Sequence, residues 1–142
     1  MKNPPSTLDD IKVHVKIKLS ALWASVMFCY IYADYFGLWK PGTLQEMLSG
    51  KMGPLGPTTQ RILLGTSIMM AIPSVMVFVS LVLTARISRW LNVIFGVIYT
   101  LIILLTIPGE WVFYVFFGVV EMVLTLFIVW YAWTWPKAIS KQ

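Results

Sequence analysis

The sequence predicts an all-α integral membrane protein: an antiparallel four-helix bundle with a short amphipathic interfacial helix between spans one and two. Three observations carry this prediction. Of the 142 residues, 58% are hydrophobic and 12% are charged, whereas soluble domains average roughly 45–50% apolar and about 25% charged residues. Four apolar runs each provide the about 20 residues that a helix needs to cross a bilayer. Basic residues and tryptophans gather at the ends of these runs.

The four apolar runs take up most of the chain, so we expect a single transmembrane domain over residues 1–142. They lie at residues 19–39, 62–85, 90–107 and 111–135. The second and third carry no charge, the first carries only Asp34, and the fourth carries only Glu121. The connections after the second and third runs are short, which predicts consecutive antiparallel neighbours.

The first connection is long and contains a helical signal at residues 43–49. Leu44, Met47 and Leu48 form an apolar stripe at i, i+3 and i+4, and Thr43 and Glu46 have the spacing of a capping box. We interpret this segment as a short amphipathic helix on the membrane surface. An ordinary ordered loop and a lid over the mouth of the bundle are the two alternatives.

The distribution of basic residues predicts that both termini are cytoplasmic. Eight lysines and arginines flank the terminal side of the spans and three flank the other side, and cytoplasmic loops carry the excess of such residues. The eight are Lys2, Lys12, Lys16, Lys18, Arg86, Arg89, Lys137 and Lys141, and the three are Lys40, Lys51 and Arg61. Because this asymmetry accounts for the net charge of +5, we expect membrane lipids as partners and no nucleic acid.

Cysteine and histidine are too scarce for several kinds of site. Cys29 is the only cysteine, so one chain can form neither a disulfide framework nor a C-x-x-C redox pair. His14 is the only histidine, which excludes paired haem ligation and a multi-histidine metal site within one chain. We therefore expect no metal and no cofactor.

Glu121 is the most unusual residue of the sequence. An ionisable group near the middle of a membrane costs roughly 2.5–3.5 kcal/mol, so it normally faces the protein interior or a wet cavity. At about 1.5 Å per residue, Glu121 lies about 16 Å beyond Glu110, near the midplane. Gly118 and Thr125 share its helix face and permit close helix packing. Glu121 is thus a candidate ligand or proton site; the alternative is a neutral carboxyl that only fixes packing.

Two other spans bring candidate partners to the same depth. Pro73 removes a backbone donor and frees a carbonyl one turn earlier, near Met69, and Ser74 adds a hydroxyl. Tyr99 lies halfway along the third span. The predicted ligand or proton site comprises Glu121, Tyr99, Pro73, Ser74 and Thr125.

A second polar group lies at the end of the first span. Asp34 and Tyr30 are four residues apart, and an acid beside a phenol is suited to binding a cation or a polar headgroup. Arg61, at the start of the second span, is the predicted charge partner of Asp34. These three residues form the predicted entrance, although Asp34 alone is equally consistent with an acid that reaches water. Asn92 is expected to form a hydrogen bond between helices.

The segments "ALWASVMFCYIYADYFGLWKPG", "AIPSVMVF", "RWLN" and "FFGVVEMVLTLFIVWYAWTWP" resemble a family of small bacterial four-helix membrane proteins, a domain of unknown function. The resemblance covers nearly the full chain and implies a multi-pass protein of the bacterial cytoplasmic (inner) membrane. In outline the chain is also similar to DoxX-like four-span proteins. Neither resemblance brings an activity.

Three functions remain open from the sequence. The first is binding or transport of a small molecule or ion at an intramembrane polar site, with or without proton coupling. The second is a structural or accessory subunit without a substrate, in which a homo-oligomer or a partner membrane subunit covers Glu121. The third is a lipid- or isoprenoid-modifying enzyme, for which the sequence offers no convergent set of catalytic groups.

Overall fold

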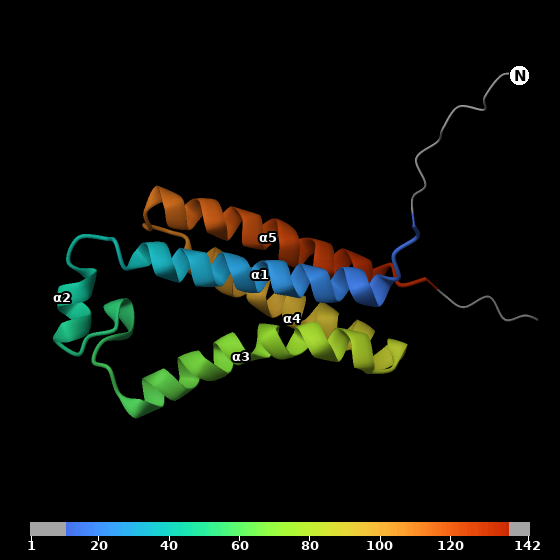
Figure 1. The fold of residues 1–142 in the computed structure, drawn as a ribbon, viewed down its shortest axis with the longest axis horizontal. Coiled ribbons are helices and arrows are strands. Elements are labelled where there is room, and N and C mark those ends of the chain that lie inside the picture. Colours follow the sequence, from blue (N-terminus) through green and yellow to red (C-terminus); the bar gives the residue numbers. More distant parts are fainter. Residues whose placement is uncertain (1–10, 137–142) are drawn as a thin grey trace, which may run out of the picture.

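The computed structural model describes residues 11–136 and contains, within them, four long helices and two short ones (Figure 1). The long helices are α1 (Val15–Gly37), α3 (Gln60–Val82), α4 (Ala85–Thr106) and α5 (Val112–Trp133), and each is long and apolar enough to cross a membrane. The short helices α2 (Thr43–Leu48) and η1 (Gly53–Leu55) lie between α1 and α3. The predicted all-helical membrane bundle is confirmed, and the protein is a multi-pass membrane protein.

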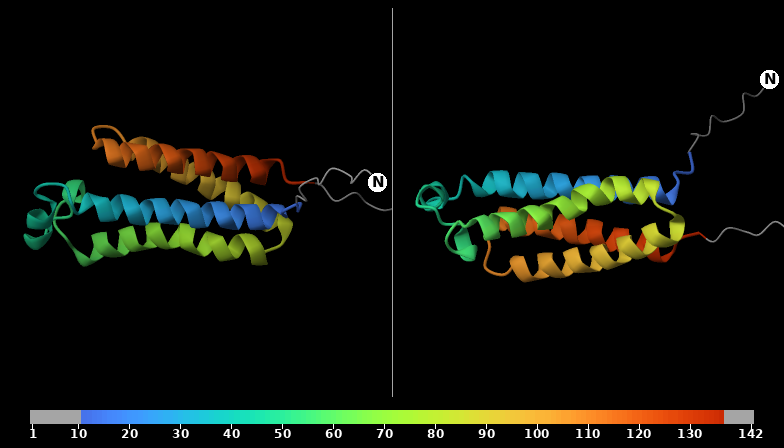
Figure 2. Two further views of the ribbon diagram at one scale, coloured as in Figure 1. Left: turned by 45° about the horizontal axis from the view of Figure 1, so that its top comes forward. Right: turned by 90° about the horizontal axis from the view of Figure 1, so that it is seen from below.

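The four long helices form a ring with one weak side. Helix α1 packs against α3 and α5, and α5 also packs against α4, whereas α3 and α4 touch over a much smaller area (Figure 2). In Figure 1 the first half of α3 diverges from the other helices. We call the end of the bundle that holds residues 38–59 and 107–111 the loop end, and the opposite end the terminal end.

The boundaries of two helices differ from the predicted ones for local reasons. Helix α1 begins at Val15 because the His14 imidazole accepts a hydrogen bond from the backbone N–H of Lys16 (3.3 Å) and caps the first turn. Helix α4 begins at Ala85 and not at residue 90, so residues 86–89, which the predicted spans leave as a connection, are part of its beginning. Only Leu83 and Thr84 separate α3 from α4.

Helix α2 confirms the predicted short helix but not its predicted cap. Gly42 precedes the first turn with a φ of 89° and no side chain caps the helix. Because Thr43 is already helical, its hydroxyl is not in the capping position, and the predicted capping box with Glu46 is wrong. The chain enters α2 from a tight turn in which glycine supplies the positive φ.

Close packing of α4 on α5 directs the Glu121 face inward. Helix α5 buries Gly118, Glu121, Thr125, Ile128 and Ala132, at spacings of three and four residues. Small residues permit the approach. A Cβ added to Gly118 would lie 2.8 Å from Ile107 Cδ1, and one added to Gly96 would lie 2.7 Å from Val129 Cγ2. The predicted inward direction of Glu121 is confirmed, since only 4% of the residue is exposed.

A buried hydrogen-bond network closes the bundle toward the terminal end. The indole Nε1 of Trp23 donates to Asn92 Oδ1 (2.7 Å), and the Ser80 hydroxyl donates to the same oxygen (3.2 Å). The Asn92 amide donates to the Ser88 carbonyl (2.8 Å). All four residues are fully buried. Asn92 therefore links α1, α3 and α4, which confirms its predicted role between helices.

Candidate functional site

A cavity of about 410 Å³ lies among the four long helices on the side of the loop end. Its acidic and phenolic side chains come from three helices: Tyr30 and Asp34 belong to α1, Tyr99 to α4, and Tyr114 and Glu121 to α5. Helix α3 contributes Thr66, Ser67, Met69 and Met70, and α4 adds Ile102, Ile103 and Thr106. The cavity thus combines apolar walls with a few converging polar groups, as small-molecule sites do.

The carboxyl of Glu121 lines this cavity and makes no hydrogen bond or ion pair within residues 11–136, although only 4% of the residue is exposed. The hydroxyl of Tyr30 is fully buried and has no hydrogen-bond partner among these residues. Buried polar groups are nearly always hydrogen-bonded, so an unpaired hydroxyl in the same cavity as an unpaired carboxyl is unusual.

Tyr99 joins α4 to α3 through a backbone carbonyl. Its hydroxyl donates a hydrogen bond to the carbonyl of Met69, and both residues line the cavity. Residue 73 is the normal helical donor to this carbonyl, but Pro73 has no N–H. The predicted free carbonyl near Met69 therefore accepts a hydrogen bond from a side chain on the neighbouring helix. Pro73 itself is buried and is not among the residues that line the cavity.

Like Pro73, two further predicted site residues do not line the cavity. Thr125 is fully buried one turn from Glu121 toward the terminal end, where it accepts a hydrogen bond from the Thr100 hydroxyl (2.8 Å). Ser74 is exposed on α3 and donates to the Met70 carbonyl (3.3 Å) in its own helix. Both hydroxyls serve packing or local hydrogen bonding in this conformation.

The predicted entrance forms only in part. Tyr30 and Asp34 line the cavity, but Arg61 is exposed at the start of α3 and lines neither this cavity nor the one beside it. Within residues 11–136 no ion pair joins Arg61 to Asp34, because the first half of α3 diverges from the bundle (Figure 1). The one ion pair there joins Lys40 to Glu110 at 2.9 Å.

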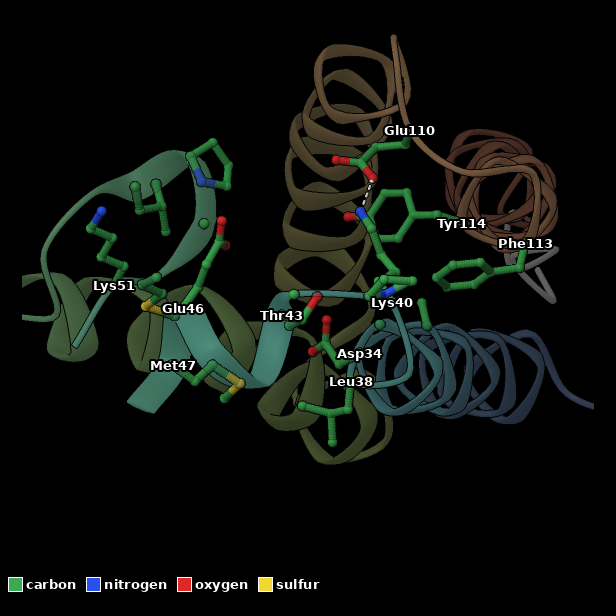
Figure 3. Close-up of a pocket in the computed structure, with 18 residues that line it drawn as sticks. Asp34, Leu38, Lys40, Thr43, Glu46, Met47, Lys51, Glu110, Phe113 and Tyr114 are labelled. Carbon is green, nitrogen blue, oxygen red and sulfur yellow. Dashed lines mark hydrogen bonds and ion pairs between the residues drawn. The ribbon is translucent and has the colours of Figure 1, made fainter. Parts of the chain in front are cut away.

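A second cavity of about 640 Å³ lies between the bundle and the loop that carries α2 and η1 (Figure 3). We call it the vestibule. Asp34, Met52 and Tyr114 line both cavities, so the two adjoin. In Figure 3, Asp34 and Tyr114 lie on the bundle side of the vestibule, while Glu46 and Lys51 face it from the loop. The inner cavity therefore opens toward the loop end.

Comparison with known proteins identifies the family. A model described as a family of unknown function (DUF6326) matches residues 9–141. The chain belongs to the DUF6326 family. No curated protein and no solved structure matches it. The predicted membership of a family without an assigned activity is confirmed, while the resemblance to DoxX-like proteins and the bacterial source stay predictions.

Sequence reasoning missed two features of this DUF6326 protein. Tyr114 lies seven residues before Glu121, on the same face of α5, so helical spacing alone was sufficient to include it. The pair of Lys40 and Glu110 had no such signal, because its members lie in two loops 70 residues apart. Tyr114 lines both the cavity and the vestibule, whereas Lys40 and Glu110 line the vestibule.

The cavity lining provides polar, acidic and aromatic groups. Within the part of the chain that the structure describes, no three histidine, cysteine, aspartate or glutamate side chains are placed to hold a metal. Two carboxylates, three phenols and apolar walls offer this DUF6326 protein hydrogen bonds, negative charge and aromatic surface.

Proposed function

We propose that this DUF6326 protein binds a small molecule or ion at Glu121, in the intramembrane cavity, and receives it through the vestibule. The observation that carries the proposal is a carboxyl with 4% exposure that lines a cavity and has no hydrogen-bond partner within residues 11–136. Leaving a buried polar group unpaired costs free energy, and a ligand with a hydrogen-bond donor would offset that cost.

The alternative of a purely structural carboxyl predicts a different surrounding. A carboxyl that only fixes packing would donate or accept a hydrogen bond between helices, as Asn92 does with Trp23. Gly118, the small residue one turn from Glu121 on the same helix face, packs against Ile107 of the same chain and therefore does not offer a contact surface to a partner helix. These two observations favour ligand binding over an accessory subunit.

Binding in this conformation proceeds from one side. The network of Trp23, Ser80, Ser88 and Asn92 closes the bundle toward the terminal end, whereas the cavity adjoins the vestibule at the loop end. With the predicted cytoplasmic termini, the ligand would arrive from outside the cell. Transport would further require this network to open, with Glu121 taking up a proton when the ligand leaves; both steps belong to the proposal.

The test is modification of Glu121 by dicyclohexylcarbodiimide, a small apolar reagent that attacks protonated carboxyl groups. The purified full-length protein in dodecyl maltoside micelles is treated with the reagent and the peptides are analysed by mass spectrometry. We expect modification at Glu121, none in the Glu121→Gln variant, and unchanged modification in the Glu46→Gln variant. A Glu121 that stays unmodified while the protein remains folded would place it in a closed core and overturn the proposal.

A further inference from the structure

The charge and shape of the cavity narrow its ligand class. Resting on the proposed function, we infer that the ligand is a protonated organic amine, with its ammonium group between Glu121 and Asp34 and its apolar part against the tyrosine rings. The inference concerns recognition only and involves no covalent step.

The acidic side chains of the cavity have no basic counterpart in its lining. Glu121 and Asp34 line it, and no lysine, arginine or histidine of residues 11–136 does. Two lysines line the adjoining vestibule: Lys40, which is paired with Glu110 at 2.9 Å, and Lys51, which belongs to the loop. Inside the inner cavity an anion would therefore meet two carboxyls and no basic side chain of residues 11–136, while a cation would meet complementary groups. Charge-assisted hydrogen bonds to a carboxylate are roughly twice as strong as neutral ones.

The aromatic lining favours a cation with an organic body. Tyr30, Tyr99 and Tyr114 reach the cavity from three different helices, and the ring centroids of Tyr30 and Tyr99 lie 6.4 Å apart. A cation within about 6 Å of an aromatic face is attracted by the ring quadrupole. The buried hydroxyl of Tyr30, unpartnered within residues 11–136, provides a further acceptor for an N–H group.

A bare metal cation fits the cavity poorly. Calcium needs about six to eight oxygen ligands and magnesium near-octahedral geometry, while two carboxyls from different helices supply few of these. The walls also contain Ile102, Ile103 and Met70, which bind hydrocarbon and not hydrated ions. A volume of about 410 Å³ corresponds to roughly a dozen water molecules at about 30 Å³ each, enough for a compact amine.

An ammonium group reaches this site from one of two sources. A free amine would enter through the vestibule at the loop end. The amine headgroup of a phospholipid would enter sideways, between α3 and α4, which is the least packed side of the ring. The recognition chemistry is the same in both cases, so the experiment includes an arm for each.

The first arm measures protection of Glu121 from dicyclohexylcarbodiimide in dodecyl maltoside micelles. Three probes share one phenethyl body: N,N-dimethylphenethylamine is a cation, phenethyl alcohol is neutral, and phenylethanesulfonate is an anion. We expect the amine to protect at concentrations at least about tenfold lower than the other two, which corresponds to about 1.4 kcal/mol. The Asp34→Asn variant should lose roughly tenfold in protection by the amine, and the control Tyr32→Phe variant, at an exposed position of α1 that lines neither cavity, should lose none.

The second arm uses nanodiscs of phosphatidylglycerol with and without phosphatidylethanolamine. A carbodiimide-dependent amide between Glu121 and the lipid amine would identify the lipid headgroup as the source and support the inference. Equal protection by the alcohol and the amine, without such a cross-link, would overturn the amine inference while leaving cavity binding intact. A Glu121 that the reagent never modifies would overturn the proposed function itself, so the two failures are distinguishable.

Discussion

The hydroxyl of Tyr99 donates its hydrogen bond to the backbone carbonyl of Met69, a carbonyl that Pro73 leaves without its helical donor. One bond thereby repairs a defect in α3 and ties α3 to α4, along the side of the ring where these helices otherwise touch least. Since Tyr99 and Met69 both line the cavity, the proline and the cavity wall are parts of one arrangement.

The Tyr99→Phe variant should lose about 1–3 kcal/mol in free energy of unfolding, because the Met69 carbonyl is left unsatisfied in an apolar surrounding. Unfolding in a mixed detergent titration measures the loss. The Tyr32→Phe variant is the control, since Tyr32 is 52% exposed and should change stability by less than about 0.5 kcal/mol.

A double-mutant cycle tests the proposed cause. The Pro73→Ala substitution restores an N–H at residue 73, so the Met69 carbonyl regains its helical donor. In that background Tyr99→Phe should cost less than it does in the native chain, by at least about 0.5 kcal/mol. Equal costs in both backgrounds would show that the tyrosine hydroxyl does not compensate for the proline.

Two helical glycines should respond to alanine with opposite signs. A Cβ at Gly96 would lie 2.7 Å from Val129 Cγ2, so Gly96→Ala forces α4 away from α5 and should destabilise by about 1–3 kcal/mol. Gly65, in α3, has no atom within 4 Å of such a Cβ, so Gly65→Ala should stabilise by up to about 1 kcal/mol. Thermal unfolding of the two purified variants compares them directly. Equal destabilisation would contradict the close α4–α5 packing.

The Asn92→Leu variant should lose about 2 kcal/mol or more in free energy of unfolding. It leaves the Trp23 indole N–H and the Ser80 hydroxyl without their shared acceptor in a fully buried position. In the Trp23→Phe background the same substitution should cost less, because one of the two donors is already gone. Additive costs, measured by chemical unfolding, would mean that the two residues do not interact.

The ion pair of Lys40 and Glu110 should control access more than stability. It joins the chain after α1 to the chain before α5 beside the vestibule, and partly exposed pairs contribute only about 0.2–1 kcal/mol. Breaking it with Lys40→Gln should raise the rate of Glu121 modification by dicyclohexylcarbodiimide, by roughly fivefold at most. The exchanged pair, Lys40→Glu with Glu110→Lys, should restore the slow rate. An unchanged rate in Lys40→Gln would exclude this role.

Helix spacing made much of the site predictable. The period of α5 places Gly118, Glu121 and Thr125 on one face, so this face was predictable from the sequence. The missing N–H of Pro73 likewise made the free carbonyl of Met69 predictable. The position of a residue along a helix does not, however, reveal whether its side chain faces the bundle or the surroundings. Ser74 lies next to Pro73 in sequence but is exposed, while Pro73 is buried.

The remaining features depend on long-range geometry. Arg61 fails to meet Asp34 because the first half of α3 leaves the bundle, and no local pattern encodes that divergence. Lys40 and Glu110 meet because two loops converge at the loop end (Figure 3). Loop residues have no periodicity from which such a contact can be predicted.

The central claim is that the cavity reaches Glu121 from the vestibule and ends before Thr125. Single-cysteine variants test it most directly: Glu121→Cys and Thr125→Cys, each in the Cys29→Ser background, treated with a membrane-impermeant methanethiosulfonate reagent in vesicles that expose the loop end. The two positions lie one turn apart on the same face of α5. We expect labelling of the Glu121→Cys variant and none of the Thr125→Cys variant; no labelling at position 121, or equal labelling at both positions, would show that the cavity does not have this extent.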